Sequence, residues 1–316
     1  MKKKINILST VNINFNHPIL NKLKKYCFIR NKINSKNLSE AKVYLSSASK
    51  LVDTEFVNKA KNLKLILSPN TGTDHLDLDY LKKKKIKVIH IAKERKLLNS
   101  FTSTSELVFA LILSLNRKLI QAQIDVKRGK WTREKFKGYQ LQSKTLGILG
   151  LGRLGSITSK IANGFGMNVI GYDIKKIKLK NVKNVSLKYL FKKSDIVSIH
   201  IHLNQKNQNF INKKLLSLMK KKSILINTSR GKIIDERDLL NKLKKNSSFN
   251  VGLDVIDGEW LPRKKLLKHP LISYSRRNDS NLLIVPHIGG STEESILGAR
   301  VFILEKLYSL IKQKKL

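Results

Sequence analysis

Residues 145–173 read TLGILGLGRLGSITSKIANGFGMNVIGYD, and this stretch decides the fold of most of the chain. An apolar strand at 145–149 leads into the glycine-rich turn GLGRLG at 150–155, and a helix follows. A second strand at 168–172 ends at Asp173. A strand, a G-x-G-x-x-G turn, a helix and a strand closed by an acid together form a unit that binds dinucleotides.

Each glycine of the turn has a mechanical reason. Gly150 allows the tight turn, Gly152 lets the backbone approach a pyrophosphate, and Gly155 permits close packing of helix and strand. The first helical residues, Arg153 and Leu154, stand where free N–H groups and the positive end of the helix dipole face the phosphates. The turn therefore predicts a pyrophosphate site.

Asp173 lies 18 positions after Gly155 (173 − 155), where a carboxylate can bind the ribose 2′-OH. The same charge repels the 2′-phosphate of NADP. Lys175 and Lys176 are nearby cations that work in the opposite direction. We expect the cofactor to be NAD.

The length of 316 residues suits two domains, and a hydrophobic content of 41% suffices for two packed cores. The single cysteine, Cys27, excludes an internal disulfide framework and fits a reducing compartment, so we expect a cytoplasmic protein. Polar residues interrupt the basic N-terminal segment, and the most apolar later run, 107–115, is shorter than the ~20 residues of a membrane span. We therefore expect no signal peptide and no membrane segment.

The net charge is +42, from 64 basic and 22 acidic residues, and such a protein attracts polyanions. The lysines recur in scattered runs such as 82–85, 175–180 and 220–222. We find no nucleic-acid-binding module or aromatic stacking platform in the sequence. The charge is thus interpreted as a compositional bias without a specific nucleic-acid partner, and a polyanion-binding protein is the least favoured alternative.

Short apolar runs alternate with helix-compatible stretches along the chain, which is typical of an α/β fold with parallel sheets. One long helix is expected at 102–130. The expected strands, besides those in the glycine-rich unit, are at 5–8, 43–47, 63–68, 86–91, 196–201, 223–227, 250–254 and 282–285.

Polar residues follow several of the later strands. Because ligands of open parallel sheets lie beyond the carboxyl ends of the strands, we expect these side chains to converge there. They are His200, His202, Thr228, Ser229, Arg230, Asp254, Glu259 and His287.

Six segments together resemble one family. They are SPNTGTDHLD at 68–77, TSELVFALIL at 104–113, LGILGLGRLG at 146–155 with Asp173, SLMKKKSILINTSRGKIIDERDLL at 217–240, GLDVIDGE at 252–259 and VPHIGGST at 285–292. The chain resembles the D-isomer-specific 2-hydroxyacid dehydrogenases, which include D-3-phosphoglycerate dehydrogenases, D-lactate dehydrogenases and glyoxylate or hydroxypyruvate reductases.

The resemblance implies two doubly wound parallel-sheet domains. A Rossmann NAD-binding domain, 101–287, would be inserted into a flavodoxin-like substrate domain made of 1–100 and 288–316. It also implies a substrate cleft between the domains and a homodimer built on the cofactor domains. We expect no C-terminal regulatory domain of the kind some phosphoglycerate-specific members carry.

By resemblance, Arg230, Glu259 and His287 are the catalytic residues. A guanidinium offers a planar fork for the carboxylate and carbonyl oxygen of a 2-oxo acid. A histidine titrates in the range needed to exchange a proton with that oxygen. A neighbouring carboxylate orients the imidazole and stabilises its charged form.

The resemblance also assigns binding residues outside this set. Asn70, Thr71 and Gly72 match the loop whose backbone binds the substrate carboxylate. Three further positions match cofactor contacts, namely His200, Thr228 and Asp254.

Two segments depart from the family pattern. Trp260 follows the glutamate where a proline is usual, and His200-Ile201-His202 replaces the usual His-x-Pro. Two histidines without nearby cysteine or aspartate support do not make a metal site, so we expect no metal.

The substrate and the function class have open alternatives. Phosphoglycerate-specific members carry arginines in the segment that corresponds to YLSSAS, 44–49, which here has none, and Lys50 is the nearest cation. A small phosphate-free 2-hydroxy or 2-oxo acid is therefore favoured. The alternative on the same fold is an NAD-binding scaffold like the C-terminal-binding-protein corepressors.

Overall fold

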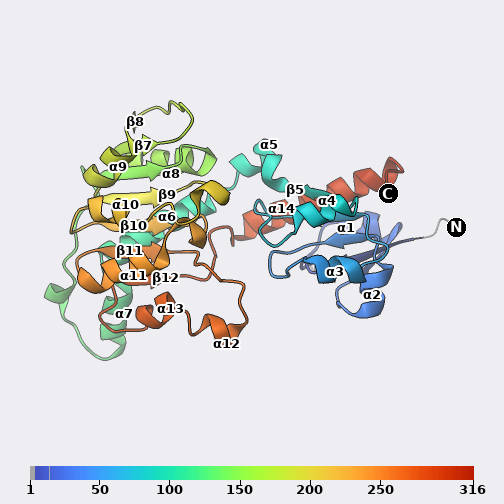
Figure 1. Cartoon of the computed structure of the whole chain (residues 1–316), viewed down its shortest axis with the longest axis horizontal. Helices are drawn as coiled ribbons and strands as arrows, with labels where there is room; N and C mark the ends of the chain where they lie inside the picture. Colours follow the sequence, from blue (N-terminus) through green and yellow to red (C-terminus); the bar gives the residue numbers. More distant parts are fainter. Residues whose placement is uncertain (1–3, 14) are drawn as a thin grey trace. The chain divides into compact units, whose positions relative to one another are not determined.

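The computed structural model describes residues 4–13 and 15–316, so the predicted span 1–100 contains residues 1–3 and 14 outside the described residues. The chain divides into two compact units. The smaller unit contains the described residues up to Phe101 together with Ser291–Leu316, and the larger unit is Thr102–Gly290 (Figure 1). The larger unit is thus an insertion into the smaller one.

The larger unit is built on a seven-stranded sheet in which every pair of neighbours is parallel. The strand order is β12-β11-β10-β9-β6-β7-β8. From β6 the chain first adds strands on one side, β7 and β8, and then on the other side from β9 onward, so the order of strands along the chain switches between β6 and β9. This is the doubly wound topology of dinucleotide-binding domains. The strands are β6 (Thr145–Leu149), β7 (Asn168–Tyr172), β8 (Lys183–Asn184), β9 (Ile196–Ile199), β10 (Ile224–Asn227), β11 (Asn250–Leu253) and β12 (Leu282–Ile284).

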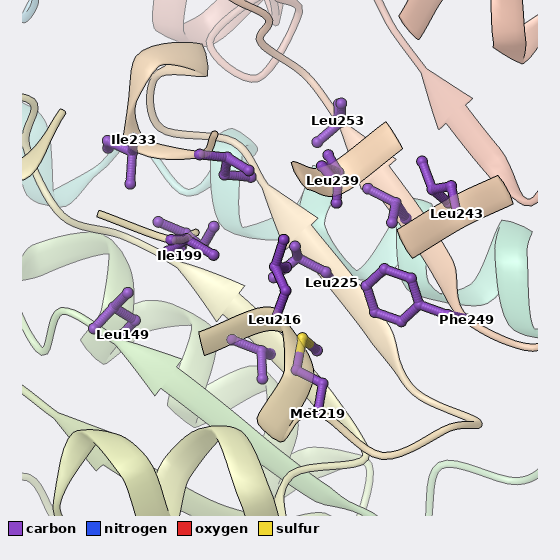
Figure 2. Packing of buried hydrophobic residues seen from close by; sticks show 14 of the residues in the cluster. Leu149, Ile199, Leu216, Met219, Leu225, Ile233, Leu239, Leu243, Phe249 and Leu253 are labelled. Carbon is purple, nitrogen blue, oxygen red and sulfur yellow. The ribbon is translucent and has the colours of Figure 1, made fainter. Parts of the chain in front are cut away.

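Helices cover both faces of this sheet, because successive strand side chains alternate between two cores. Ile224 and Ile226 of β10 pack with α6 and α8, whereas Leu225 packs on the opposite face with α10 and α11, as Figure 2 shows for part of that cluster. The helices are α6 (Ser103–Asn116), α7 (Leu119–Lys127), α8 (Arg153–Gly164), α9 (Leu187–Lys193), α10 (Lys213–Leu218), α11 (Glu236–Lys245), α12 (Arg263–Leu266) and α13 (Pro270–Ser275), with 3₁₀ turns η2 (Arg133–Phe136), η3 (Gln205–Asn207) and η4 (Gly231–Ile233).

The smaller unit has a five-stranded parallel sheet in the order β2-β1-β3-β4-β5, which is the flavodoxin-like order. The C-terminal helix α14 joins its core through Ile303, Leu304 and Leu307. The elements are β1 (Ile5–Ser9), α1 (Pro18–Lys24), β2 (Cys27–Arg30), α2 (Ser35–Glu40), β3 (Val43–Leu45), α3 (Thr54–Lys59), β4 (Leu65–Ser68), α4 (Leu78–Lys83), β5 (Lys87–His90), η1 (Ile91–Lys93), α5 (Arg95–Asn99) and α14 (Glu293–Lys312). The expected fold class, two parallel-sheet α/β domains, is confirmed.

Three local predictions were wrong or incomplete. The single helix predicted at 102–130 is two helices, α6 and α7, because Lys118 adopts a left-handed backbone conformation with φ of 51° between them. The strand β2 was not predicted, since its sequence CFIR mixes polar and apolar residues at a sheet edge. The two-residue strand β8 is exposed and has no apolar signal.

One segment, Arg95–Asn116, is long and apolar enough to cross a membrane by length and composition, with a mean hydropathy of 1.3 over its best window. In the structure it comprises α5 and α6, which are separated by non-helical residues. Val108, Phe109, Leu111 and Ile112 of α6 are at most 4% exposed and pack in the core of the larger unit. We therefore assign α6 to the protein core.

Candidate active site

A histidine and a glutamate form a close pair in the larger unit. The Nδ1 atom of His287 lies 3.0 Å from both Oε1 and Oε2 of Glu259. Their side chains are 35% and 16% exposed, so the pair is partly desolvated but accessible at the imidazole. The hydrogen bond to Glu259 raises the pKa of His287 above its ordinary value. Because Nδ1 faces Glu259, Nε2 is the nitrogen that can serve a substrate oxygen.

The backbone of His287 is held in an unusual conformation by Asp254. His287 has φ of 53°, in the left-handed region that is costly for a residue with a Cβ. Its N–H donates to the carbonyl oxygen of Asp254 at 2.9 Å. The N–H groups of Ile288 and Gly289 donate to Oδ1 and Oδ2 of the Asp254 carboxylate at 2.6 and 2.9 Å. Asp254 therefore shapes the turn that aims His287.

This role of Asp254 was missed from the sequence, which indicated only a cofactor contact. Asp254 is 2% exposed, and burial raises its pKa. The signal that could have revealed the role is that Asp254 directly follows β11, while His287 lies three residues (287 − 284) after the end of β12, the neighbouring strand. The cofactor contact of Asp254 stays a prediction.

Arg230 follows β10, the next strand of the sheet. Its Nη1 donates to the carbonyl oxygen of Ser229 at 2.7 Å, and its own carbonyl accepts from Nδ2 of Asn227 at 2.9 Å. The positive charge of Arg230 lowers the pKa of His287, against the larger effect of Glu259. The structure therefore brings the three predicted catalytic residues to the carboxyl ends of three adjacent strands.

Two loops of the site touch through a glycine. A Cβ placed on Gly231 would lie 2.1 Å from the carbonyl carbon of Ile256 and 2.2 Å from the backbone nitrogen of Asp257. No side chain fits there, so the loop that carries Arg230 and the loop that carries Glu259 are packed backbone against backbone.

The glycine-rich turn has room for a phosphate group. Gly150 has φ of 99°, and a Cβ on Gly155 would lie 2.0 Å from the carbonyl oxygen of Gly150, so both positions require glycine. A Cβ on Gly152 would meet nothing within 4 Å. No side chain caps the first turn of α8, whose N–H groups are available to an anion. Arg153 and Leu154 begin this helix, as predicted.

The carboxylate of Asp173 lies beside this turn, at the end of β7. Its Oδ2 accepts a hydrogen bond from the N–H of Leu151 at 2.8 Å, and its Oδ1 accepts from the N–H of Lys175 at 2.9 Å. These bonds orient the acid next to the glycine-rich turn, where a ribose would follow the pyrophosphate.

Two buried polar atoms near the strand ends have no hydrogen-bond partner in the protein. They are Oγ1 of Thr228 and Nδ1 of His200. The Nε2 of His200 contacts Oγ of Ser198 at 2.8 Å, and burial lowers the pKa of His200 to about 4, which keeps the imidazole neutral. Unpartnered buried polar atoms are costly and suit a ligand that completes them, so the residues present fit a bound dinucleotide.

The two histidines of the His200-Ile201-His202 segment do not form a pair, because β9 ends at Ile199 and His202 is exposed. Among the described residues no group of three or more histidine, cysteine, aspartate or glutamate side chains could hold a metal ion.

The three predicted substrate residues of the smaller unit follow β4. Both the backbone N–H and the side-chain amide of Asn70 contact Oγ of Ser68, at 3.4 and 3.1 Å. Thr71 and Gly72 lie in the same loop. Their role in binding a carboxylate stays a prediction.

Two family models match the chain. Residues 6–96 match the catalytic domain of the D-isomer specific 2-hydroxyacid dehydrogenases, and residues 109–289 match their NAD-binding domain. A hydroxypyruvate reductase of Thermotoga maritima is 33% identical over 86% of this chain and 86% of its own length. A D-3-phosphoglycerate dehydrogenase of Methanocaldococcus jannaschii is 32% identical over 87% of this chain, which spans 51% of that protein.

A solved structure agrees over nearly the whole chain. The D-lactate dehydrogenase of Aquifex aeolicus, in complex with NAD and lactic acid, superimposes with a TM-score of 0.83 at 29% identity, covering 97% of this chain and 95% of that one. The match includes both units and the glycine-rich turn that fits a dinucleotide. The chain therefore belongs to the D-isomer specific 2-hydroxyacid dehydrogenase family, and it is an NAD-dependent oxidoreductase of that family.

Proposed function

We propose that this enzyme interconverts small 2-oxo acids and D-2-hydroxy acids, with His287 as the acid and base, Glu259 as its partner and Arg230 as the substrate anchor. The observation that carries the proposal is the 3.0 Å contact between Nδ1 of His287 and the Glu259 carboxylate. A carboxylate in that position fixes the imidazole orientation and leaves Nε2 for the reacting oxygen.

The proton step falls to His287. When NADH is bound, it supplies the hydride that forms the new C–H bond. The carbonyl oxygen of the 2-oxo acid takes its proton from Nε2 of protonated His287, which the negative charge of Glu259 stabilises. In the reverse direction neutral His287 accepts the hydroxyl proton.

Arg230 supplies the fixed positive charge for the substrate. Its planar guanidinium can bond the carboxylate and the polarised carbonyl oxygen together, which the ammonium of a lysine cannot do. We assign the backbone of Asn70, Thr71 and Gly72, in the loop after β4, as the further carboxylate-binding loop, because these residues match the loop that binds the substrate carboxylate in the family.

Residues of the larger unit would hold the cofactor in two places. Gly150, Gly152, Arg153, Leu154 and Gly155 would receive the pyrophosphate at the start of α8. Asp173 would bind the adenosine ribose. The unpartnered atoms of His200 and Thr228 support contacts near the carboxyl ends of β9 and β10, and Asp254 is the remaining proposed contact.

The substrate class we favour carries no phosphate. Residues 44–49 include no lysine or arginine that could bind a phosphate. Tyr44 is buried and its hydroxyl contacts Oγ1 of Thr10 at 2.9 Å, while the hydroxyls of Ser47 and Ser49 contact each other. The cations closest in sequence are Lys42 and Lys50, on either side of this segment.

A corepressor-like scaffold needs the dinucleotide but not an acid–base pair, and the His287–Glu259 contact therefore favours turnover. Among the residues that the structure describes, we find no observation that favours a polyanion-binding role. We further propose a cytoplasmic location, because the one cysteine of the sequence, Cys27, is buried and unpaired. We also propose that the protein has no specific nucleic-acid partner and no membrane partner.

We propose a homodimer that covers the apolar surface around α7. Leu119, Ile120, Ile124 and Val126 of this helix are each 40–49% exposed, and Trp131 after it is 87% exposed. A second copy would bury this apolar surface in the way that homodimer interfaces do.

The acid–base assignment predicts a pH profile. The pKa of His287 is raised, so reductive kcat/KM is supported below that pKa and falls as pH rises through it, while oxidation shows the opposite dependence. Glu259→Gln removes the negative charge, so reductive kcat/KM should begin to fall at lower pH. Arg230→Lys should lower kcat/KM by about 10–100-fold without much change in the pH at which it falls. The measurement is kcat/KM against pH, with NADH and a panel of 2-oxo acids. Near-parental turnover by His287→Ala would refute the assignment.

Cofactor preference tests Asp173. The parent should prefer NAD, because the carboxylate repels a 2′-phosphate, and Asp173→Ala should reduce the ratio of kcat/KM for NAD over NADP by about tenfold or more. A parental preference for NADP, or an unchanged ratio in the variant, contradicts the role of Asp173.

The contact at Gly231 tests how tightly the two loops are coupled. Gly231→Ala should lower kcat by about 10²-fold with native circular dichroism, because its Cβ displaces the backbone of Ile256 and Asp257 by roughly 1 Å. Gly164→Ala is the matched control, since its Cβ meets nothing within 4 Å. Equal activity of the two variants would show that the loop spacing is not critical.

The oligomeric state tests the α7 surface. Light scattering should give a dimer for the parent and a monomer for the Ile120→Asp variant, because an aspartate carboxylate is costly to desolvate in an apolar interface. Phe28→Asp in the smaller unit, where Phe28 is 53% exposed, should remain dimeric. A monomeric parent rules out the proposed interface.

A further inference from the structure

A second carboxylate–imidazole pair lies in the larger unit, outside the residues that the proposed reaction uses. The Oε2 atom of Glu236 is 3.1 Å from Nε2 of His269, and the two side chains are only 17% and 11% exposed. Glu236 is the first residue of α11, and His269 precedes α13. The pair therefore joins the beginnings of two helices.

This pair also holds the loop that carries Glu259. The backbone N–H of Asp257, two residues before Glu259, donates to Oε1 of Glu236 at 2.7 Å. The Nδ1 of His269 accepts the N–H of Leu271 at 3.3 Å, which places the proton of the neutral imidazole on Nε2. The Glu236 carboxylate thus accepts one hydrogen bond from the loop, and its other oxygen lies within ion-pair distance of His269.

An ionised Glu236 is an expensive anchor at this place. Burial, helped by neighbouring negative charges and opposed by the hydrogen bond from Asp257, raises its pKa to about 7. Burial also lowers the pKa of His269, so the imidazole contributes little compensating charge. A glutamine could accept the same backbone bond without the cost of a buried charge. The charged groups that act on the pair are Asp235 of its own helix cap and Asp257 and Glu259 of the loop. The Nζ of Lys232, in η4, lies 4.0 Å from Oδ1 of Asp257.

We propose that Glu236 is a positioning residue for proton transfer: as a carboxylate that accepts the N–H of Asp257 and contacts His269 it holds Glu259 against His287, and it loosens the loop when it is protonated. The inference rests on the proposed acid–base role of His287 and Glu259. A proton on Oε2 would face the Nε2–H of His269. Avoiding this contact between two protons requires the His269 tautomer with its proton on Nδ1, which loses the hydrogen bond from the N–H of Leu271. Protonation therefore weakens an anchor of the loop in either case.

The sign of the pH effect follows. Reductive turnover should fall on the acid side as pH drops through the pKa of Glu236, about 7, and on the basic side as pH rises through the raised pKa of His287. The acid limb belongs to Glu236 and the basic limb to His287, so substitutions separate them.

The first experiment measures reductive kcat and KM against pH for the parent, Glu236→Gln, Glu236→Ala and Glu293→Gln. Glu293 is the matched control, because it is also the first residue of a helix, α14, but is exposed. We expect Glu236→Gln to lose the acid limb and keep the basic limb. Glu236→Ala should lower kcat by about tenfold across the profile with the KM for NADH unchanged. Glu293→Gln should match the parent.

The second experiment reads the loop without turnover. The chain has two tryptophans, so a Trp131→Phe background leaves Trp260, which follows Glu259 and whose ring centroid lies 6.1 Å from that of His287. The emission of Trp260 should titrate with a midpoint near the Glu236 pKa of about 7, and this transition should be absent in Glu236→Gln.

The outcomes separate the two proposals. Full turnover by His287→Ala removes the proposed function, while the Trp260 transition still reports Glu236. If His287→Ala is inactive but Glu236→Gln keeps the parental acid limb and the Trp260 transition, the positioning role is wrong and the proposed function stands. This comparison uses only Glu236→Gln, so it holds even if Glu236→Ala does not fold.

Discussion

The two hydrogen bonds that the Asp254 carboxylate accepts from the backbone of Ile288 and Gly289 are the constraint on which the site depends. They connect the end of β11 to the turn after β12 and hold His287 at φ of 53°. The left-handed conformation is costly for a residue with a Cβ, and burial is costly for a carboxylate. The two hydrogen bonds offset both costs, because they hold the turn and solvate the carboxylate of Asp254.

From this turn the imidazole of His287 contacts the carboxylate of Glu259. Two neighbouring charges act on the pKa of His287 in opposite directions. Glu259 raises the pKa of His287 through a direct hydrogen bond, whereas Arg230 lowers it by a weaker effect of its charge. The substrate role proposed for Arg230 is therefore compatible with a raised pKa of His287. The close approach at Gly231 keeps the loops of Arg230 and Glu259 in backbone contact.

The acidic residues near the site stand out in a chain that has 64 basic and only 22 acidic residues. Asp235, Glu236, Asp254, Asp257 and Glu259 lie within 25 positions of one another. Burial raises the pKa of Glu236 and of Asp254, so these carboxylates do not stabilise the fold by being charged. The hydrogen bonds that Glu236 and Asp254 accept from the site loops explain these carboxylates better than solvation at the surface does. The scattered lysines, by contrast, lie mostly on the exposed surface.

The sequence by itself determined the fold class, since runs apolar on both faces require a parallel sheet covered on two sides, and the glycine spacing at 150–155 requires a dinucleotide turn. It also indicated that Arg230, Glu259 and His287 follow strands and converge at their carboxyl ends, while the adjacency of β10, β11 and β12 is seen only in the structure. It did not reveal the break at Lys118, because a lysine in the left-handed region leaves no compositional signal. Nor did it reveal the pairs Asp254 with Ile288 and Glu236 with His269, whose partners are 34 and 33 positions apart (288 − 254 and 269 − 236). Such contacts depend on strand order and helix packing, which only the tertiary structure decides.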